Sequence, residues 1–274
     1  MARPKVIDFH VHIGQKKDWH PWVHELMKRA DPEQFERLEE MMTPKNLERF
    51  LRRQGVDKAV ILADNSPITT GVVTNKFVAK FCQGHSYFIP FCSIHPFEDD
   101  IVKDTRRCIS ELGFKGVKMY PTYQHFYPND ERFYPLYETV QELEVPIMFH
   151  TGSSVFKGSR IKYGEPKLLD DVAVDFPDLK IVMAHSGRGA WYDQATLLAT
   201  LHENVFMEVS GLPPQNLLKY FPSLEKVAHK VIFGSDWPTI SDIKGNIETI
   251  RGLGLGKRTI EGILGENARR VLGL

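Results

Sequence analysis

Short apolar runs alternate with longer amphipathic stretches from residue 6 to residue 236. The apolar runs are rich in Val, Ile and Phe, and the run at 58–63 is continuous enough for a strand that is buried on both faces. We expect eight strands, at residues 6–12, 58–63, 87–94, 115–120, 146–150, 180–185, 205–209 and 230–236. Because helical patterns separate them, the sequence predicts an α/β fold of the (β/α)8 TIM-barrel type. A doubly wound open sheet is the alternative, but no glycine-rich phosphate-binding turn follows the first strand.

One connection is longer than a barrel requires. Residues 16–42, which follow the first strand, contain Trp19 and Trp22 and then a series of charged, helix-prone residues. This insertion is predicted to form a lid or a helical hairpin, in which the two tryptophans either close the site or pack the lid. No Gly/Ser-rich linker or change of composition divides the chain, so we expect residues 1–274 to form one domain.

Composition narrows the class of partner. Of the 274 residues, 42% are hydrophobic and 26% are charged, and 35 basic residues balance 35 acidic ones. Proteins that bind nucleic acids or membrane surfaces need a basic excess, so we expect neither partner, but rather a small-molecule substrate. The three cysteines lack metal-ligand spacing, and we find neither an apolar leader nor an apolar run of about 18 residues. These features favour a cytoplasmic protein with reduced thiols.

Polar residues stand where the predicted strands end. His10 and His12 alternate in the first strand, so their side chains are expected to project from the same face. His150, His185 and Asp236 end the fifth, sixth and eighth strands. In a TIM barrel the C-terminal ends of the strands form one rim, where the reactive groups lie. Imidazoles and a carboxylate gathered on one rim predict a metal site.

Several motifs resemble those of a known family. The segments IDFHVH, MFHTG, AHSGRG and GSDWP occur in this order, at residues 7–12, 148–152, 184–189 and 234–238, and the end of the chain reads ILGENARRVLG at 263–273. Together they resemble the metal-dependent amidohydrolase superfamily. The most similar branch is the amidohydrolase-related group (amidohydrolase 2), which includes aminocarboxymuconate-semialdehyde decarboxylase, resorcylate decarboxylases and several lactonases and hydratases. The resemblance is specific to the branch and not to a reaction.

The resemblance implies a division of roles. His10, His12, His150 and Asp236 would bind one divalent ion, and His185 would be a catalytic base or electrostatic group rather than a permanent ligand. This set of ligands suits Zn²⁺ best, with Mn²⁺ and Fe²⁺ as alternatives. Such an ion lowers the pKa of bound water to about 7. Asp236 would take the proton from this water and later deliver it to a leaving group.

Four further residues are predicted to contact the substrate, namely Lys118, Tyr120, Arg188 and Trp237. The rings of Tyr120 and Trp237 would stack on a flat substrate, and Arg188 would pair with a carboxylate, although a surface position suits that arginine equally well. Lys118 has three interpretations: a cation that binds a substrate carboxylate, an outward solvated side chain, or the carboxylated lysine that bridges two metals in some members of the superfamily. A second metal ion is expected only in the last case.

Three functions are compatible with these residues. The first is metal-activated hydrolysis of an amide, lactone or related bond in a small carboxylated or cyclic substrate. The alternative is lyase chemistry at the same site, either non-oxidative decarboxylation or hydration. A non-catalytic binding barrel is disfavoured, because the full set of implied ligands is present. Members of the group often form dimers, so a homodimer is also expected.

Overall fold

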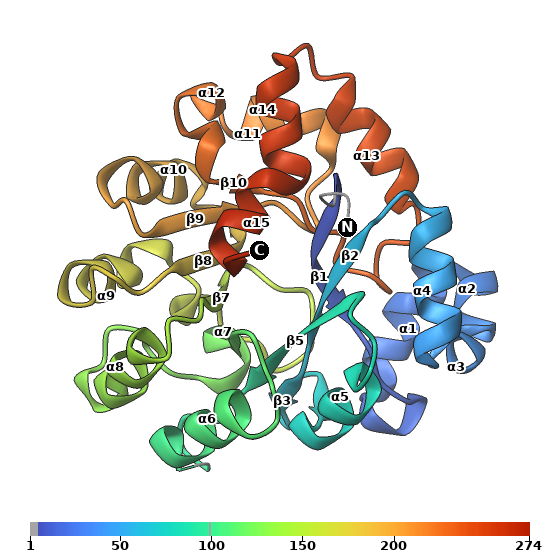
Figure 1. Ribbon diagram of the computed structural model, residues 1–274, viewed down its shortest axis with the longest axis horizontal. Helices are drawn as coiled ribbons and strands as arrows, with labels where there is room; N and C mark the ends of the chain where they lie inside the picture. The colour runs from blue at the N-terminus through green and yellow to red at the C-terminus, as the bar shows by residue number, and fades with distance from the viewer. Residues whose placement is uncertain (1–4, 99) are drawn as a thin grey trace.

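An eight-stranded parallel sheet forms the centre of the protein (Figure 1), seen in a computed structural model that describes residues 5–98 and 100–274. Its strands are, in order around the sheet, β1 (Ile7–His12), β2 (Lys58–Leu62), β5 (Phe88–Ser93), β6 (Val117–Met119), β7 (Ile147–Gly152), β8 (Ile181–Arg188), β9 (Val205–Glu208) and β10 (Val231–Ile232). Hydrogen bonds from Phe9 N to Phe233 O and from His12 N to Trp237 O join β1 to the segment after β10. This seam closes the ring, so the predicted TIM barrel is confirmed.

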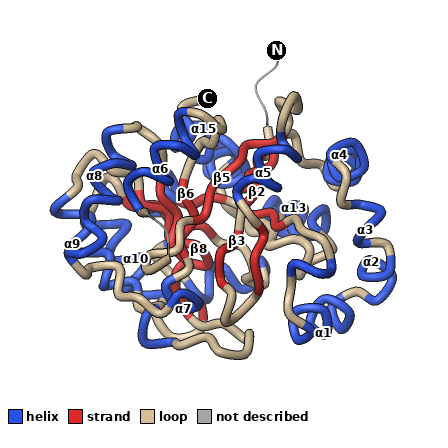
Figure 2. The backbone as a smooth tube through the Cα atoms, turned by 90° about the horizontal axis from the view of Figure 1, so that it is seen from below, coloured by secondary structure: helices blue, strands red, loops and turns tan. Residues whose placement is uncertain are grey.

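Helices surround the strands, as Figure 1 shows along the barrel and Figure 2 shows from the side. They are α4 (Pro44–Arg53), α5 (Asn75–Cys82), α6 (Ile101–Ser110), α7 (Pro121–Gln124), α8 (Tyr134–Glu142), α9 (Leu169–Asp175), α10 (Tyr192–Leu201), α11 (Leu217–Tyr220), α12 (Leu224–Val227), α13 (Ile243–Arg251), α14 (Lys257–Glu261) and α15 (Asn267–Leu272). Helix α4 begins as its sequence indicates, because the Thr43 side chain accepts a hydrogen bond from Asn46 N and Pro44 occupies the first helical position. Within the described residues, no helix is long and apolar enough to cross a membrane.

Two apolar layers stabilise the barrel. The inner layer fills the barrel with side chains such as Ile7, Phe9 and Phe91, and the outer layer packs the strands against the helices. Ala268 and Val271 of α15 belong to the inner layer, and Figure 1 shows this helix lying across the middle of the ring. The last helix therefore covers one end of the barrel and leaves the other end for a site.

The insertion after β1 forms three short helices, α1 (Pro21–Ala30), α2 (Pro32–Glu36) and α3 (Leu38–Met41). It rests on an antiparallel hairpin, β3 (Asp64–Ser66) and β4 (Gly71–Val73), that the sequence pattern did not predict. Trp22 Nε1 donates a hydrogen bond to the Thr69 carbonyl between these two strands, at 2.7 Å. The insertion is thus attached to the barrel at the rim where the predicted site residues lie.

Candidate active site

A cavity of about 330 Å³ lies at the C-terminal ends of the strands. Trp19, Val23 and Met27 of the insertion line it, as do Tyr123 and Phe156 from the segments after β6 and β7. The five residues predicted from the strand ends all line the same cavity: His10, His12, His150, His185 and Asp236. The structure therefore brings together side chains that lie up to 226 positions apart in the sequence, from His10 to Asp236.

A shift of register in β1 directs the first two histidines. Phe9 packs inside the barrel, whereas Val11 packs in the outer layer, although strict alternation would put both on the same face. The pairing of β1 with β2 is irregular between Asp8 and Val11, so one irregular step reverses the faces. Beyond it His10 and His12 both face the cavity, and their Nε2 atoms lie 3.1 Å apart.

Asp236 reaches the same point from the seam of the barrel. Its backbone N–H donates to the His10 carbonyl at 2.9 Å, and its Oδ1 lies 3.5 Å from Nε2 of both His10 and His12. Ligand atoms about 2.0–2.2 Å from a common ion stand roughly 3–4 Å from one another. The three atoms thus have the spacing of a shared ion. Asp236 has a left-handed backbone (φ 68°), a conformation that Asp and Asn tolerate better than most residues.

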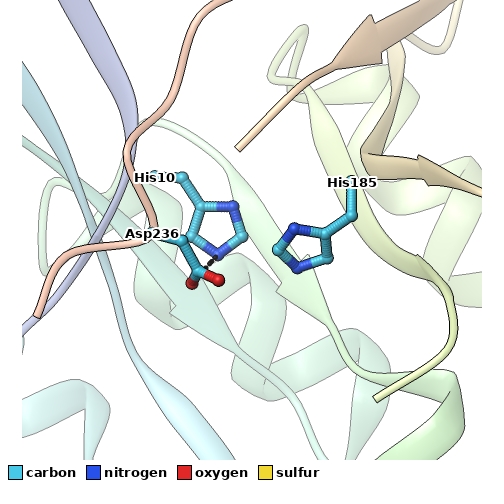
Figure 3. Close-up of side chains that lie close together, drawn as sticks. All are labelled: His10, His185 and Asp236. Carbon is cyan, nitrogen blue, oxygen red and sulfur yellow. Dashed lines mark ion pairs between the residues drawn. The ribbon is translucent and has the colours of Figure 1, made fainter. Parts of the chain in front are cut away.

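His185 and His150 complete the cluster. His10, His185 and Asp236 each offer a ligand atom within 4.8 Å of the others. Figure 3 shows these three side chains gathered at one point. The ring of His150 lies 4.7 Å from the ring of His185 between centroids, and the buried Nε2 of His150 has no hydrogen-bond partner in the described part of the chain. His185 is close enough to be a ligand itself, so its role outside the ligand set stays a prediction.

The chemistry of these groups fits a divalent metal ion. Burial lowers the pKa of His10, His150 and His185 well below the ordinary value, so the three imidazoles are neutral and offer lone pairs. Asp236 adds a carboxylate to the same group, and a bound ion would satisfy the orphan nitrogen of His150. Imidazoles with a carboxylate are common ligands of Zn²⁺ and also suit other first-row divalent ions.

Glu208 is a part of the site that the sequence analysis missed. This fully buried carboxylate at the end of β9 accepts hydrogen bonds from His10 Nδ1 (3.1 Å) and from Ser210 N (2.7 Å). The approach needs Gly234 in the neighbouring segment, because a Cβ there would collide with Glu208 Oε1 and with His10 Cβ. A charged residue in the apolar run at 205–209 is the signal that could have revealed it. Carboxylates that hold the second nitrogen of a metal-binding histidine orient the ring.

We expect Glu208→Gln to weaken the affinity for Mn²⁺ or Zn²⁺ about 10–100-fold, since the amide holds the His10 ring less firmly than the carboxylate does. Competition with a chromophoric chelator measures this affinity. Glu203→Gln is the matched control, because the Glu203 side chain is 95% exposed. Unchanged metal affinity in Glu208→Gln, with normal folding of the metal-free protein, would remove Glu208 from this role.

Lys118 is fully buried on β6, and its Nζ has no hydrogen-bond partner among the described residues. Burial lowers the pKa of Lys118 to about 8, against the opposing influence of the Glu208 and Asp236 carboxylates. The outward, solvated interpretation is therefore wrong. Lys118 is also absent from the described wall of the cavity, so the structure does not support its direct contact with a substrate. Carboxylation of Lys118, and with it a second ion, stays a prediction.

Of the other three predicted substrate-contacting residues, two line the cavity and one does not. Tyr120 and Arg188 line the cavity, and their contact with a substrate stays a prediction. Trp237 is fully buried beside Phe50, and its Nε1 donates to Gln34 Oε1 at 2.7 Å. The prediction that Trp237 stacks on a substrate is therefore wrong. Its ring anchors the insertion to the barrel instead.

Comparison with known proteins identifies relatives of this chain. The chain is similar to the gamma-resorcylate decarboxylases of Polaromonas sp. (strain JS666), at 25% identity over 249 residues, and of Rhodococcus jostii, at 27% over 188 residues. The first match covers 69% of this chain and 75% of the relative, and the second covers 51% and 56%. The chain thus matches little more than half the length of the Rhodococcus protein.

Solved structures show the same fold. An uncharacterized TIM-barrel protein from Bordetella bronchiseptica superposes with a TM-score of 0.79 at 23% identity, covering 98% of both chains. A dihydroxybenzoic acid decarboxylase from Polaromonas sp., solved with manganese and the inhibitor 2-nitroresorcinol, has a TM-score of 0.71 at 16% identity, with 100% of this chain and 98% of the other covered. The family model described as Amidohydrolase matches residues 7–274. On this match, the chain belongs to the amidohydrolase family, and its fold is that of a TIM barrel.

Proposed function

We propose that the protein is a metal-dependent lyase that removes the carboxylate of a small aromatic acid without an oxidant. The sequence motifs favour hydrolysis, with the lyase as the alternative, whereas the names of the curated relatives support the lyase. The single observation that argues most for it is the position of Arg188, whose Nη1 lies 3.9 Å from Asp236 Oδ2. A carboxylate paired with Arg188 would lie next to the group best suited to protonate carbon.

The walls of the cavity suit a flat, one-ring substrate. The rings of Tyr120 and Tyr123 are stacked with centroids 5.6 Å apart, and Phe156 lies edge-on to Tyr123. All three line the cavity, whose volume of about 330 Å³ is at the low end for ligand pockets, about 300–1,000 Å³. Such walls favour an aromatic ring and exclude water from it.

Each step of the proposed reaction is assigned to a particular residue. A divalent ion held by His10, His12, His150 and Asp236 would supply a Lewis acid that fixes and polarises a substrate oxygen. Arg188 would hold the carboxylate, and Asp236 would donate a proton to the ring carbon that bears it. The carbon–carbon bond then breaks, its electron pair returns to the ring, and carbon dioxide leaves. One proton from solvent restores Asp236, so the step needs no redox partner.

His185 is held in a defined orientation for this reaction. Its Nδ1 lies 2.9 Å from the Ser210 carbonyl, which accepts the hydrogen bond from the neutral ring. The other nitrogen, Nε2, is then free to accept a hydrogen bond in the cavity or to bind the ion.

The experiment that tests the function is product analysis. The protein loaded with Mn²⁺ or Zn²⁺ is incubated in D₂O with a panel of hydroxybenzoates, lactones and amides. A decarboxylase releases carbon dioxide and leaves deuterium on the carbon that lost the carboxylate. Hydrolysis of a lactone or amide, with incorporation of ¹⁸O from labelled water and no carbon dioxide, would overturn the proposal.

We expect Arg188→Lys to raise KM for the carboxylated substrate about 10–100-fold, because a charge-assisted hydrogen bond contributes roughly 1.5–3 kcal/mol. In the wild type the guanidinium also donates to the Ser153 carbonyl, at 3.1 Å from Nη2, and this contact fixes its orientation. Steady-state kinetics measure the effect, with Arg160→Lys as the control because Arg160 is exposed. An unchanged KM would place the carboxylate elsewhere.

A further inference from the structure

Asp64 stands across the barrel from Arg188. It is the first residue of β3, two positions after β2 ends, whereas Arg188 is the last residue of β8. In the sheet order β2 is the second strand and β8 the sixth, and strands four places apart in a closed ring of eight face one another. Both side chains line the cavity. A ligand held by Arg188 at one end therefore extends toward Asp64 at the other.

The Asp64 carboxylate has an unused acceptor. The residue is only 3% exposed, and its Oδ2 accepts a hydrogen bond from Thr70 Oγ1 at 2.6 Å. Its Oδ1 is buried and has no hydrogen-bond partner in the part of the chain that the structure describes. A buried acceptor without a partner is costly, so this atom is suited to a donor that arrives with a ligand. The proposed reaction does not use it.

Two tyrosine hydroxyls of the cavity wall are already engaged. The Tyr120 hydroxyl donates to the Ala63 carbonyl at 2.7 Å, and the Tyr123 hydroxyl donates to Ser154 Oγ at 2.9 Å. Burial raises the pKa of Asp64 above its ordinary value, against the opposing influence of the Ser66 and Thr70 hydroxyls and of the Lys118 charge. In its ionised form, Asp64 would attract a hydroxyl or amino group and repel a second carboxylate.

We propose that Asp64 determines the class of substrate, an inference that rests on the proposed function. It selects aromatic monocarboxylates with a hydroxyl or amino group meta or para to the carboxylate, and it excludes dicarboxylates. The meta or para position follows from the placement of Asp64 and Arg188 on opposite strands of the ring, because an ortho group would stay beside the carboxylate, near Arg188. The donor group on the ring hydrogen-bonds to Asp64 Oδ1, while Thr70 holds the other oxygen.

The test measures binding rather than turnover. Isothermal titration of the Mn²⁺-loaded protein is carried out with 3-hydroxybenzoate, 4-hydroxybenzoate, 2-hydroxybenzoate, benzoate and benzene-1,3-dicarboxylate, and chromatography verifies that each probe is recovered intact. We expect the 3- or 4-hydroxy acid to bind about tenfold more tightly than benzoate, and the dicarboxylate to bind most weakly. Asp64→Ala should bring the hydroxy acids close to benzoate and should not change the ratio of 2-hydroxybenzoate to benzoate.

Two further variants keep the result interpretable. Asp64→Asn retains a partner for Thr70 and removes the charge, so it should bind the dicarboxylate more tightly than the wild type does, even if Asp64→Ala folds poorly. Asp242→Asn is the matched control, since Asp242 caps helix α13 by accepting from Gly245 N and Asn caps equally well. Equal affinities for benzoate and both the 3- and 4-hydroxy acids, no measurable binding of any probe at millimolar concentration, or a preference that persists in Asp64→Ala would overturn the proposal. If the selectivity holds while no carbon dioxide is released from any substrate, the decarboxylase proposal fails and the role of Asp64 stands.

Discussion

Asp236→Asn is expected to lower kcat by about 10²–10⁴-fold while the protein remains folded, the range that a positioned acid or base contributes. The amide keeps an oxygen for the metal but has no acidic proton for carbon. Asparagine also tolerates the left-handed backbone of this position (φ 68°), so the seam of the barrel should be preserved. The measurement is single-turnover kinetics on protein of known metal content, with a thermal melt to verify folding.

Asp193→Asn is the control for this variant, because Asp193 lies in the first turn of α10, outside the described wall of the cavity. It should keep wild-type kcat and metal content. If Asp236→Asn retains wild-type turnover with metal bound, the proton comes from another group, and His185 becomes the first candidate to examine.

Removing the metal is expected to abolish turnover and to lower the melting temperature by about 5–10 °C, as follows for an ion present at about 100 times its Kd. The physical reason is that the metal-free cluster has neutral histidines crowded against one another, and His150 Nε2 has no hydrogen-bond partner among the residues that the structure describes. Dialysis against a chelator, followed by activity assays and calorimetry, measures both effects.

Readdition of Mn²⁺ or Zn²⁺ should restore both activity and melting temperature, and the restoring stoichiometry gives the number of ions. Two ions per chain would favour carboxylation of Lys118, which mass spectrometry of the intact protein would then detect. Full activity of the metal-free protein would contradict the proposed chemistry.

Much of the barrel could be predicted because its strands are buried on both faces. Apolar runs such as 58–63 and 180–185 are distinctive in a sequence; the first contains β2, and β8 begins within the second. The same regularity brought the candidate ligands to one rim, since polar residues such as His150 and His185 stand where the apolar runs end. The prediction succeeded where a local pattern decides the structure.

The errors occurred where distant segments decide the structure. Trp237 was expected in the pocket, but its direction depends on Gln34, about 200 positions away and in the insertion. The hairpin of β3 and β4 was missed because strands of three residues are too short for a recognisable alternation. Asp64 and Glu208 are single acidic residues in the sequence, and their importance appears only when burial and hydrogen-bond partners are known.

The seam between β1 and the segment after β10 determines when, during synthesis, the candidate metal ligands can come together. Asp236 N bonds to the carbonyl of His10, and His12 N bonds to the carbonyl of Trp237, so the hydrogen bonds that close the ring also align the histidines with the acid. During synthesis the histidines leave the ribosome first, and the acid follows only after more than four fifths of the polypeptide. Binding of an ion by all the predicted ligands is therefore a late event that depends on a long-range contact. A truncated product that ends before residue 236 lacks Asp236 and cannot form this site.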